Sequence, residues 1–171
     1  MQSISRKTTN STISKVDALI RRAYRHCEAG ELRSAFRLIL SSAKLGDAAA
    51  QHGVGYYYDV GIGVKPSRSS ALRWYRRAYR KGYASAANNI GMIFRDEGET
   101  KRALTWFQRA ARLGDTDANL EIAKMLLQYP KQVADAVPYL KRVVAAKPRV
   151  DVTEASRKEA LRLLKTLPRM R

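Results

Sequence analysis

Several residue types that would direct this chain to particular protein classes are scarce or absent. A single cysteine, Cys27, excludes an internal disulfide, and two histidines without any zinc-type spacing predict no metal site and a reducing compartment. No apolar run approaches the length of a membrane span, and residues 1–15 lack the apolar core of a secretory signal. The sequence therefore predicts a cytoplasmic protein with no membrane span.

Acidic residues are also few. The chain has 33 Lys and Arg against 15 Asp and Glu, which gives a formal net charge of +18. Such a field favours encounters with acidic proteins, nucleic acid or anionic membranes, and it says little about fold. The 45% of apolar residues are nevertheless enough for a globular core.

No arrangement of residues predicts catalysis. His26 and Cys27 are adjacent, so on a helix they point about 100° apart, and no nearby acid would orient the histidine as a base. The Gly61-x-Gly63 segment lacks the preceding strand and the Gly-Lys-Ser/Thr of a phosphate-binding loop. We therefore expect no enzyme, no catalytic residues, no cofactor and no small-molecule substrate.

The chain is instead rich in helical periodicity. Ser14 can cap a first helix together with Asp17, and this helix is expected to end at Ala29-Gly30. A second amphipathic helix is predicted over residues 31–44 and stops at Gly46. The two make a helical hairpin.

This hairpin recurs along the chain. Successive alanines of one apolar stripe, at 35, 71, 103 and 136, are separated by 36, 32 and 33 residues. Large side chains follow three positions later, and a glycine follows eleven positions later in all but the last repeat. The large side chains are Leu38, Trp74, Trp106 and Tyr139. In the preceding helices, small residues such as Ala50 and Gly55 are expected to let neighbouring helices approach closely.

Two stretches carry a resemblance to a known family. The sequences VGYYYDVGIGVKPSRSSALRWYRRAYRKG and IGMIFRDEGETKRALTWFQRAARLG resemble Sel1-like repeats, which are related to tetratricopeptide repeats. The resemblance is strong over residues 48–115 and weaker in the outer units. It implies an all-α, right-handed α-solenoid of about four helical hairpins with a C-terminal capping helix, whose first helices line a concave groove.

The expected organisation is one repeat domain with short ends. We predict a flexible basic tail over residues 1–13, a domain over 14–167 and a tail over 168–171. Pro138 is expected to make its helix start late or kink, and Asp151 with Glu154 is expected to cap the last helix. The repeat units are predicted at about 14–46, 47–82, 83–114 and 115–150, followed by the capping helix at 152–167.

Two surfaces are candidates for binding. The resemblance places the exposed positions of the first helices in a partner-binding groove: His52, Tyr56, Asn88, Asn89, Met92, Arg95, Lys124 and Gln128. A basic face on the second helices is predicted from their helical spacing, opposite the apolar stripe: Arg73, Arg76, Arg77, Arg80, Arg109, Arg112 and Arg142. Each surface could equally be ordinary solvated helix.

The predicted function is a non-enzymatic protein–protein interaction module with an acidic protein partner. Small proteins with such repeats in bacteria act as adaptors or neutralise a cognate toxin, so the resemblance suggests an adaptor or an immunity protein. The alternative is a nucleic-acid-binding protein that uses the arginine stripe, and binding to anionic membrane is a weaker third hypothesis. Against nucleic acid, Trp74 and Trp106 are predicted on the buried face, where they could not stack on bases.

Overall fold

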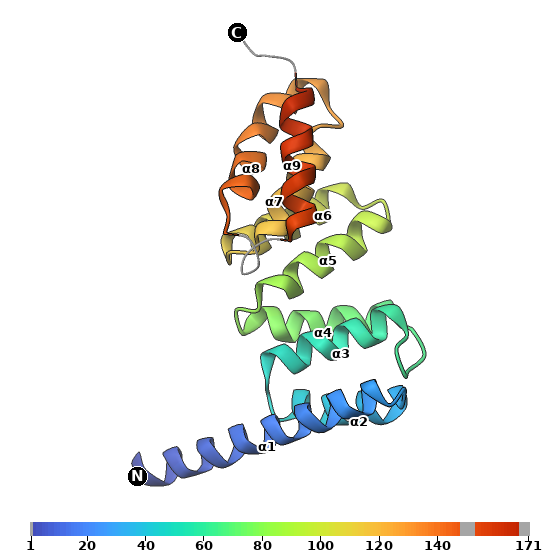
Figure 1. The fold of residues 1–171 in the computed structure, drawn as a ribbon, viewed down its shortest axis with the longest axis vertical. Helices are drawn as coiled ribbons and strands as arrows, with labels where there is room; N and C mark the ends of the chain where they lie inside the picture. The colour runs from blue at the N-terminus through green and yellow to red at the C-terminus, as the bar shows by residue number, and fades with distance from the viewer. Residues whose placement is uncertain (1, 148–152, 168–171) are drawn as a thin grey trace. The chain divides into compact units, whose positions relative to one another are not determined.

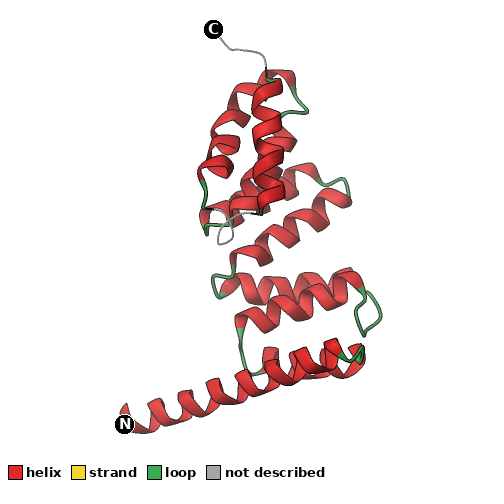
Figure 2. Ribbon diagram, in the orientation of Figure 1, coloured by secondary structure: helices red, strands yellow, loops and turns green. Residues whose placement is uncertain are grey.

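The computed structural model describes residues 2–147 and 153–167, with side chains from Thr12 onward. All regular structure in these ranges is helical, with nine α-helices, one short 3₁₀ helix and no strand (Figures 1 and 2). The predicted all-α class is therefore confirmed. The chain divides into two compact units, Met1–Tyr83 and Ala84–Arg171, here called unit 1 and unit 2. Their boundary lies beside the predicted repeat limit at residue 82.

Unit 1 consists of two helical hairpins (Figure 1, blue to green). The first pairs α1 with α2, the second pairs α3 with α4, and α2 packs against α3. The bounds are α1 Gln2–Glu28, α2 Leu32–Lys44, α3 Ala48–Val60 and α4 Arg68–Arg80. Phe36, Ala43, Ala50 and Val54 form a buried cluster between the hairpins, against which Trp74 and several other partly buried side chains pack.

The long turn between α3 and α4 is structural. Gly61 and Gly63 have φ angles of 85° and 66°, in the left-handed region that favours glycine. A Cβ at Gly63 would also collide with the backbone carbonyl of Leu32 at the start of α2. This segment therefore closes against the neighbouring hairpin, as expected for a turn.

Unit 2 continues the pattern with two hairpins and a final helix. Helix α5 pairs with α6, α7 pairs with α8, and α9 packs mainly on α8. The bounds are α5 Ala84–Asp96, α6 Thr100–Arg112, α7 Thr116–Leu126, α8 Val133–Ala145 and α9 Glu154–Thr166, with the 3₁₀ helix at Pro130–Gln132.

Helix α9 completes the core at the end of unit 2. Its Ala160 is fully buried in one cluster with Leu120, Ala136, Leu140 and Val143, and Leu163, Leu164 and the following Leu167 pack around that cluster. The prediction that a last helix covers the open face of the last hairpin is confirmed. Thr153 caps this helix by accepting a hydrogen bond from the Ser156 amide at 3.1 Å. The predicted cap residue Asp151 and the tail 168–171 lie outside the described residues.

Small residues bring paired helices together, as predicted. A Cβ added at Gly55 would lie 2.5 Å from the ring of Tyr75, and one at Gly91 would lie 2.7 Å from the ring of Phe107. Tyr75 and Phe107 are both fully buried. The equivalent glycines of α3 and α5 therefore each make room for the aromatic ring of the following helix.

The predicted cap at Ser14 is wrong, and so is a late start caused by Pro138, whereas the alternative effect of Pro138, a kink, stays a prediction. Helix α1 begins at Gln2, so Ser14 lies inside it and does not cap it. Helix α8 begins three residues before Ala136, just as α6 begins three before Ala103, so Pro138 does not delay its start. Residues 2–13 contain neither proline nor glycine to stop a helix. The division of the chain into a tail and a single domain remains a prediction.

Candidate functional site

The predicted groove residues are distributed over both units. His52 and Tyr56 lie on α3, in unit 1. The other six belong to unit 2, on α5, on α7 or, for Gln128, just beyond the end of α7. Tyr56, Met92 and Gln128 are exposed, whereas the other five are half-buried. The surroundings differ between the two units.

His52 is part of an aromatic group in unit 1. Its ring centroid lies 4.8 Å from that of Tyr83 and 5.5 Å from that of Tyr75. Burial lowers the pKa of the His52 imidazole, because a low-dielectric environment disfavours the charged form. At neutral pH the ring is therefore an uncharged aromatic surface.

Beside His52 lies a hollow of about 290 Å³, here called the first-helix pocket. Its walls come from α1, α2 and α3, with Tyr83 after α4. Tyr57 reaches across it and shares a hydrogen bond of 3.2 Å with the Cys27 thiol. Burial, with a smaller contribution from Cys27, raises the pKa of Tyr57, so its hydroxyl stays protonated. The lining residues are Ile20, Ala23, Tyr24, Cys27, Ile39, Ala49, Ala50, His52, Gly53, Tyr57 and Tyr83.

The predicted groove cations of unit 2 are held in ion pairs. Arg95 pairs with Asp96 at 3.1 Å and also with Glu121. Lys124 pairs with Glu121 at 3.2 Å and with Glu159 of α9 at 3.1 Å. Burial opposes the charge on both cations, but these carboxylates outweigh it and raise the pKa values of Arg95 and Lys124. Glu121 thus joins α5 to α7, and Glu159 joins α7 to α9.

The uncharged groove residues of unit 2 surround this network. Met92 is 37% exposed on α5. The side-chain oxygen of Asn88 is buried and has no hydrogen-bond partner within the described structure. The predicted groove residues of unit 2 therefore include an unsatisfied amide acceptor, an exposed thioether and two paired cations.

The predicted basic face has a regular internal construction. The guanidinium carbons of Arg77 and Arg109 each lie 4.5 Å from the ring centroids of Trp74 and Trp106, three residues earlier. Arg142 lies 5.2 Å from Tyr139 in the same way. Trp74 packs against the buried cluster of unit 1, as predicted. The prediction that the tryptophans lie apart from the arginines is wrong, because both rings are half-buried and within reach of the arginine one turn later.

The seven arginines differ in exposure but share one electrostatic property. Arg109 is half-buried, and the other six are exposed. Arg73 donates to the Ser70 hydroxyl at 3.1 Å, and Arg112 donates to the Gln108 carbonyl at 3.3 Å. Within the described part of the chain none of the seven forms an ion pair with an acid. Their positive charge is therefore not neutralised locally.

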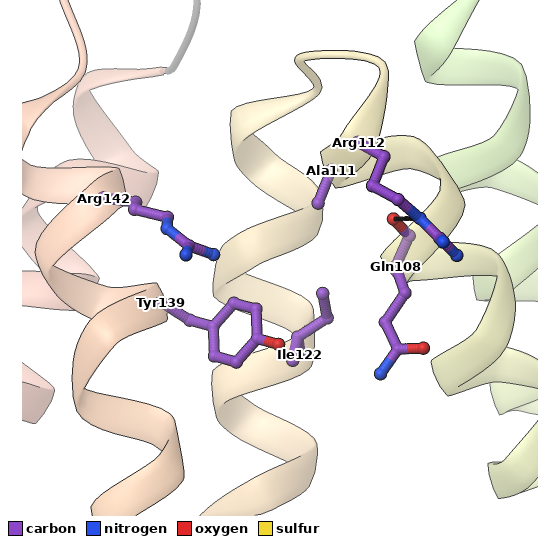
Figure 3. Close-up of a pocket in the computed structure, with 6 residues that line it drawn as sticks. All are labelled: Gln108, Ala111, Arg112, Ile122, Tyr139 and Arg142. Atoms are coloured by element: carbon purple, nitrogen blue, oxygen red, sulfur yellow. Dashed lines mark hydrogen bonds between the residues drawn. The ribbon is translucent and has the colours of Figure 1, made fainter.

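A second hollow lies beside this basic face in unit 2 (Figure 3). It measures about 300 Å³, and an adjoining hollow of about 460 Å³ shares four of its residues. We call the two together the α6–α8 cleft. Tyr139 and Arg142 enter from α8, Ile122 of α7 lies at the base, and Arg112 lies on the α6 side. The remaining lining residues are Leu104, Gln108, Ala111, Leu126, Asp135 and Pro138.

Sequence reasoning missed most residues of both hollows. It singled out His52 but not Tyr24, Tyr57 or Tyr83, which join it only through the packing of α1 against α2 and of α2 against α3. Gln108 was likewise not selected. One usable signal was the spacing of Tyr139 and Arg142, which repeats that of Trp106 and Arg109. It indicated a ring with an arginine one turn later, but not the hollow beside them.

Two kinds of feature are absent from the described residues. No helix there is long and apolar enough to cross a membrane. The same residues contain no group of three or more His, Cys, Asp or Glu side chains that could hold a metal ion.

Comparison with known proteins identifies the repeats. The family model of the Sel1 repeat matches residues 48–83 and 84–115. A putative Sel1-like repeat-containing protein of Acanthamoeba polyphaga mimivirus is 25% identical over 91 residues. These residues are 53% of this chain but only 17% of that protein, so the chain corresponds to a small part of this relative.

Solved structures show the same fold. A Sel1 repeat protein from Oxalobacter formigenes has a TM-score of 0.67 at 20% identity, covering 90% of this chain and 73% of that one. A protective antigen of uropathogenic Escherichia coli with an SLR fold has a TM-score of 0.68 at 19% identity, covering 82% and 32%. YrrB, a tetratricopeptide repeat protein described as having an unusual peptide-binding site, has a TM-score of 0.55 at 22% identity, covering 93% and 88%. The chain thus has the fold of these Sel1 and tetratricopeptide repeat proteins, and residues 48–115 match the Sel1 repeat model twice in succession.

Proposed function

We propose that this chain is a non-enzymatic protein-binding module that holds a segment of a partner protein against the first helices of unit 1. The observation that carries the proposal is the first-helix pocket, where tyrosine, histidine and aliphatic side chains surround about 290 Å³. Sel1 and tetratricopeptide repeats generally mediate protein–protein interaction, which supports this class of function.

The size and chemistry of the pocket suit a side chain of a bound segment. A volume of about 290 Å³ is at the small end for ligand sites but accommodates one apolar or aromatic side chain. The neutral ring of His52 and the tyrosine rings offer aromatic surface, and buried aromatic contacts carry much of the binding energy at protein interfaces. Tyr24, 66% exposed at the rim, and Tyr56, 46% exposed on α3, extend this surface.

The charge of the chain adds a preference for acidic partners. A formal net charge of +18 accelerates encounters with negatively charged proteins and disfavours basic ones. An adaptor that docks an acidic effector and an immunity protein that neutralises an acidic toxin both fit this preference.

Site-specific photo-crosslinking tests the proposal. A photo-reactive phenylalanine analogue replaces Tyr24 or Tyr56 in cells of the source organism, and Tyr129 of unit 2, 48% exposed, is the matched control. Positions 24 and 56 are expected to give adducts that protease removes and nuclease does not, with little adduct from position 129. Equal labelling from all three positions, or adducts sensitive only to nuclease, would overturn the proposal.

A second candidate function is nucleic-acid binding by the basic face. The observation that favours it is the set of seven arginines without a carboxylate partner in the described chain. Phosphate contacts by these arginines predict binding to arbitrary RNA that weakens steeply with salt. A salt titration with an oligonucleotide distinguishes the two functions, because no binding at low salt excludes this candidate.

A further inference from the structure

We propose that the α6–α8 cleft is a second docking site, which binds a short acidic segment of the partner protein. In this arrangement an apolar side chain lies beside Leu104, Leu126 and Pro138, and flanking carboxylates are attracted to Arg142 on the α8 side and to Arg112 on the α6 side. This inference rests on the proposed function, because it takes the molecule that occupies the cleft to be a protein. It concerns a different surface, built on the second helices of unit 2 instead of the first helices of unit 1.

The shape of the cleft provides a base and two walls (Figure 3). Ile122, a buried residue of α7, lies at the base. Tyr139 and Arg142 form the wall contributed by α8, and Gln108 with Arg112 forms the wall contributed by α6. The hollow is therefore a concave apolar site with polar groups at its edge, which is the usual composition of a docking pocket.

The charges of the cleft are asymmetric. The 300 Å³ hollow is lined by Arg112 and Arg142 and by no acid, while the adjoining 460 Å³ hollow shares Arg142 but adds Asp135 and lacks Arg112. A carboxylate in the segment would be repelled by Asp135 and attracted toward the two arginines. Leu104, Leu126 and Pro138 line the Asp135 side, so the apolar side chain is favoured there and the acid is favoured near Arg112.

Both arginines have donors to offer. The guanidinium carbon of Arg142 lies 5.2 Å from the ring centroid of Tyr139, and no acid of the described residues forms an ion pair with this arginine. The recorded hydrogen bond of Arg112 uses only Nε, toward the Gln108 carbonyl, so its terminal nitrogens remain for an anion. The planar guanidinium fork matches a carboxylate in a bidentate arrangement.

The same geometry favours protein over nucleic acid at this cleft. A nucleic-acid strand is held by phosphate contacts and by stacking of bases on free aromatic faces. The nearby ring of Trp106 is covered by Arg109 at 4.5 Å, and Tyr139 is covered by Arg142. An apolar base next to two arginines therefore suits a peptide with both acidic and apolar residues better than it suits a nucleic-acid strand.

The test uses the full chain and a defined probe. A fluorescein-labelled peptide, Asp-Glu-Leu-Glu-Asp, is titrated with the protein at low salt and followed by fluorescence polarisation. The amide analogue Asn-Gln-Leu-Gln-Asn removes the charge, and Asp-Glu-Ser-Glu-Asp removes the apolar side chain. Both analogues are expected to bind about tenfold more weakly or worse, which corresponds to about 1.4 kcal/mol.

Matched variants locate the binding. The double variant R112A/R142A is expected to weaken peptide binding about tenfold or more, whereas R76A/R80A, which removes the same charge from α4, changes it by less than about threefold. Ala111→Met fills the hollow without changing charge, and it is also expected to weaken binding. Thermal melting of each variant verifies that it folds.

Several outcomes would overturn the inference. Equal weakening by the two double variants would show attraction to net charge alone, and equal binding of the amide peptide would remove the role of the carboxylate. Displacement of the peptide by a short oligouridylate at equal concentration would assign the cleft to nucleic acid. If the peptide does not bind while photo-crosslinks at positions 24 and 56 persist, only the cleft inference is lost. The proposed function fails independently, through the crosslinking result.

Discussion

At the scale of single residues, the paired helices depend on positions where no side chain fits. Gly91 of α5 lies against the buried ring of Phe107, and Gly55 of α3 lies against Tyr75. Glycine inside a helix costs roughly 1 kcal/mol relative to alanine, so its presence here requires a compensating contact. That contact is the close approach of the aromatic ring. Replacing such a glycine by alanine should therefore lower the stability of the protein although it raises the helix propensity of the segment.

Gly91→Ala is expected to destabilise the protein. Overpacking against Phe107 costs about 1–3 kcal/mol, and the gain of about 1 kcal/mol in helix propensity reduces this to a net loss of up to about 2 kcal/mol. The melting temperature should fall by up to roughly 8 °C in a calorimetric or circular-dichroism melt. Gly53→Ala is the control, because a Cβ there meets only Ile39 at 3.4 Å. The explanation fails if Gly91→Ala melts at or above the wild-type temperature.

His52 makes stability depend on pH. Its pKa in the folded protein is below the ordinary value of 6.5, so below that pH the unfolded chain binds more protons than the folded chain. The free energy of unfolding should therefore fall as the pH drops from about 7.5 to 5.5, and fall less in His52→Gln. Urea denaturation across this range measures the slope. His26→Gln, which removes the contact with Glu31, is the control, and an unchanged slope in His52→Gln would contradict the assignment.

At the scale of elements, sequence periodicity predicted the repeated hairpins because each repeat carries the same stripe of small and large residues. The end of α1 was also predictable, since Gly30 follows it. The role of α9 was predictable because this helix has a leucine-rich face. The start of α1 was not predictable. Ser14 is a residue type that often caps helices, but nothing in the residues before it breaks the helix. Helix α8 contains Pro138 yet keeps the register of its repeat, which the packing of Ala136 and Leu140 imposes.

The candidate sites were less predictable than the elements. Helical spacing identified the arginines of the basic face, but an individual spacing does not show which aromatic ring an arginine covers. The first-helix pocket requires Tyr24, Tyr57 and Tyr83 to converge from three segments, which only tertiary packing can bring about. The ion pair between Lys124 and Glu159 was equally unpredictable, because tertiary packing brings together two residues that are 35 positions apart in sequence.

At the scale of the whole molecule, excess positive charge works against the folded state. With a formal charge of +18, the positive side chains repel one another. This repulsion is stronger in the compact folded state than in the unfolded chain, where the charges are farther apart. On α4 the arginines at 73 and 77, and at 76 and 80, are like charges one helical turn apart, and each such pair costs roughly 0.2–0.5 kcal/mol. The surface ion pairs of the described residues offset only part of this, because exposed pairs contribute little.

Salt should therefore stabilise this protein. Raising sodium chloride from about 0.05 to 0.5 M shortens the screening length from more than 10 Å to less than 8 Å, which weakens repulsion between separated charges. The melting temperature should rise across this range, and it should rise less in R73E/R80E, where the net charge is lower and both of these like-charge pairs on α4 become pairs of unlike charge. Two controls separate charge screening from anion binding at the α6–α8 cleft. The salt series is repeated with sodium fluoride in place of sodium chloride, and it is repeated with the R112A/R142A variant. A melting temperature that falls with salt would mean that the ion pairs around Glu121 and Glu99 outweigh the excess of positive charge.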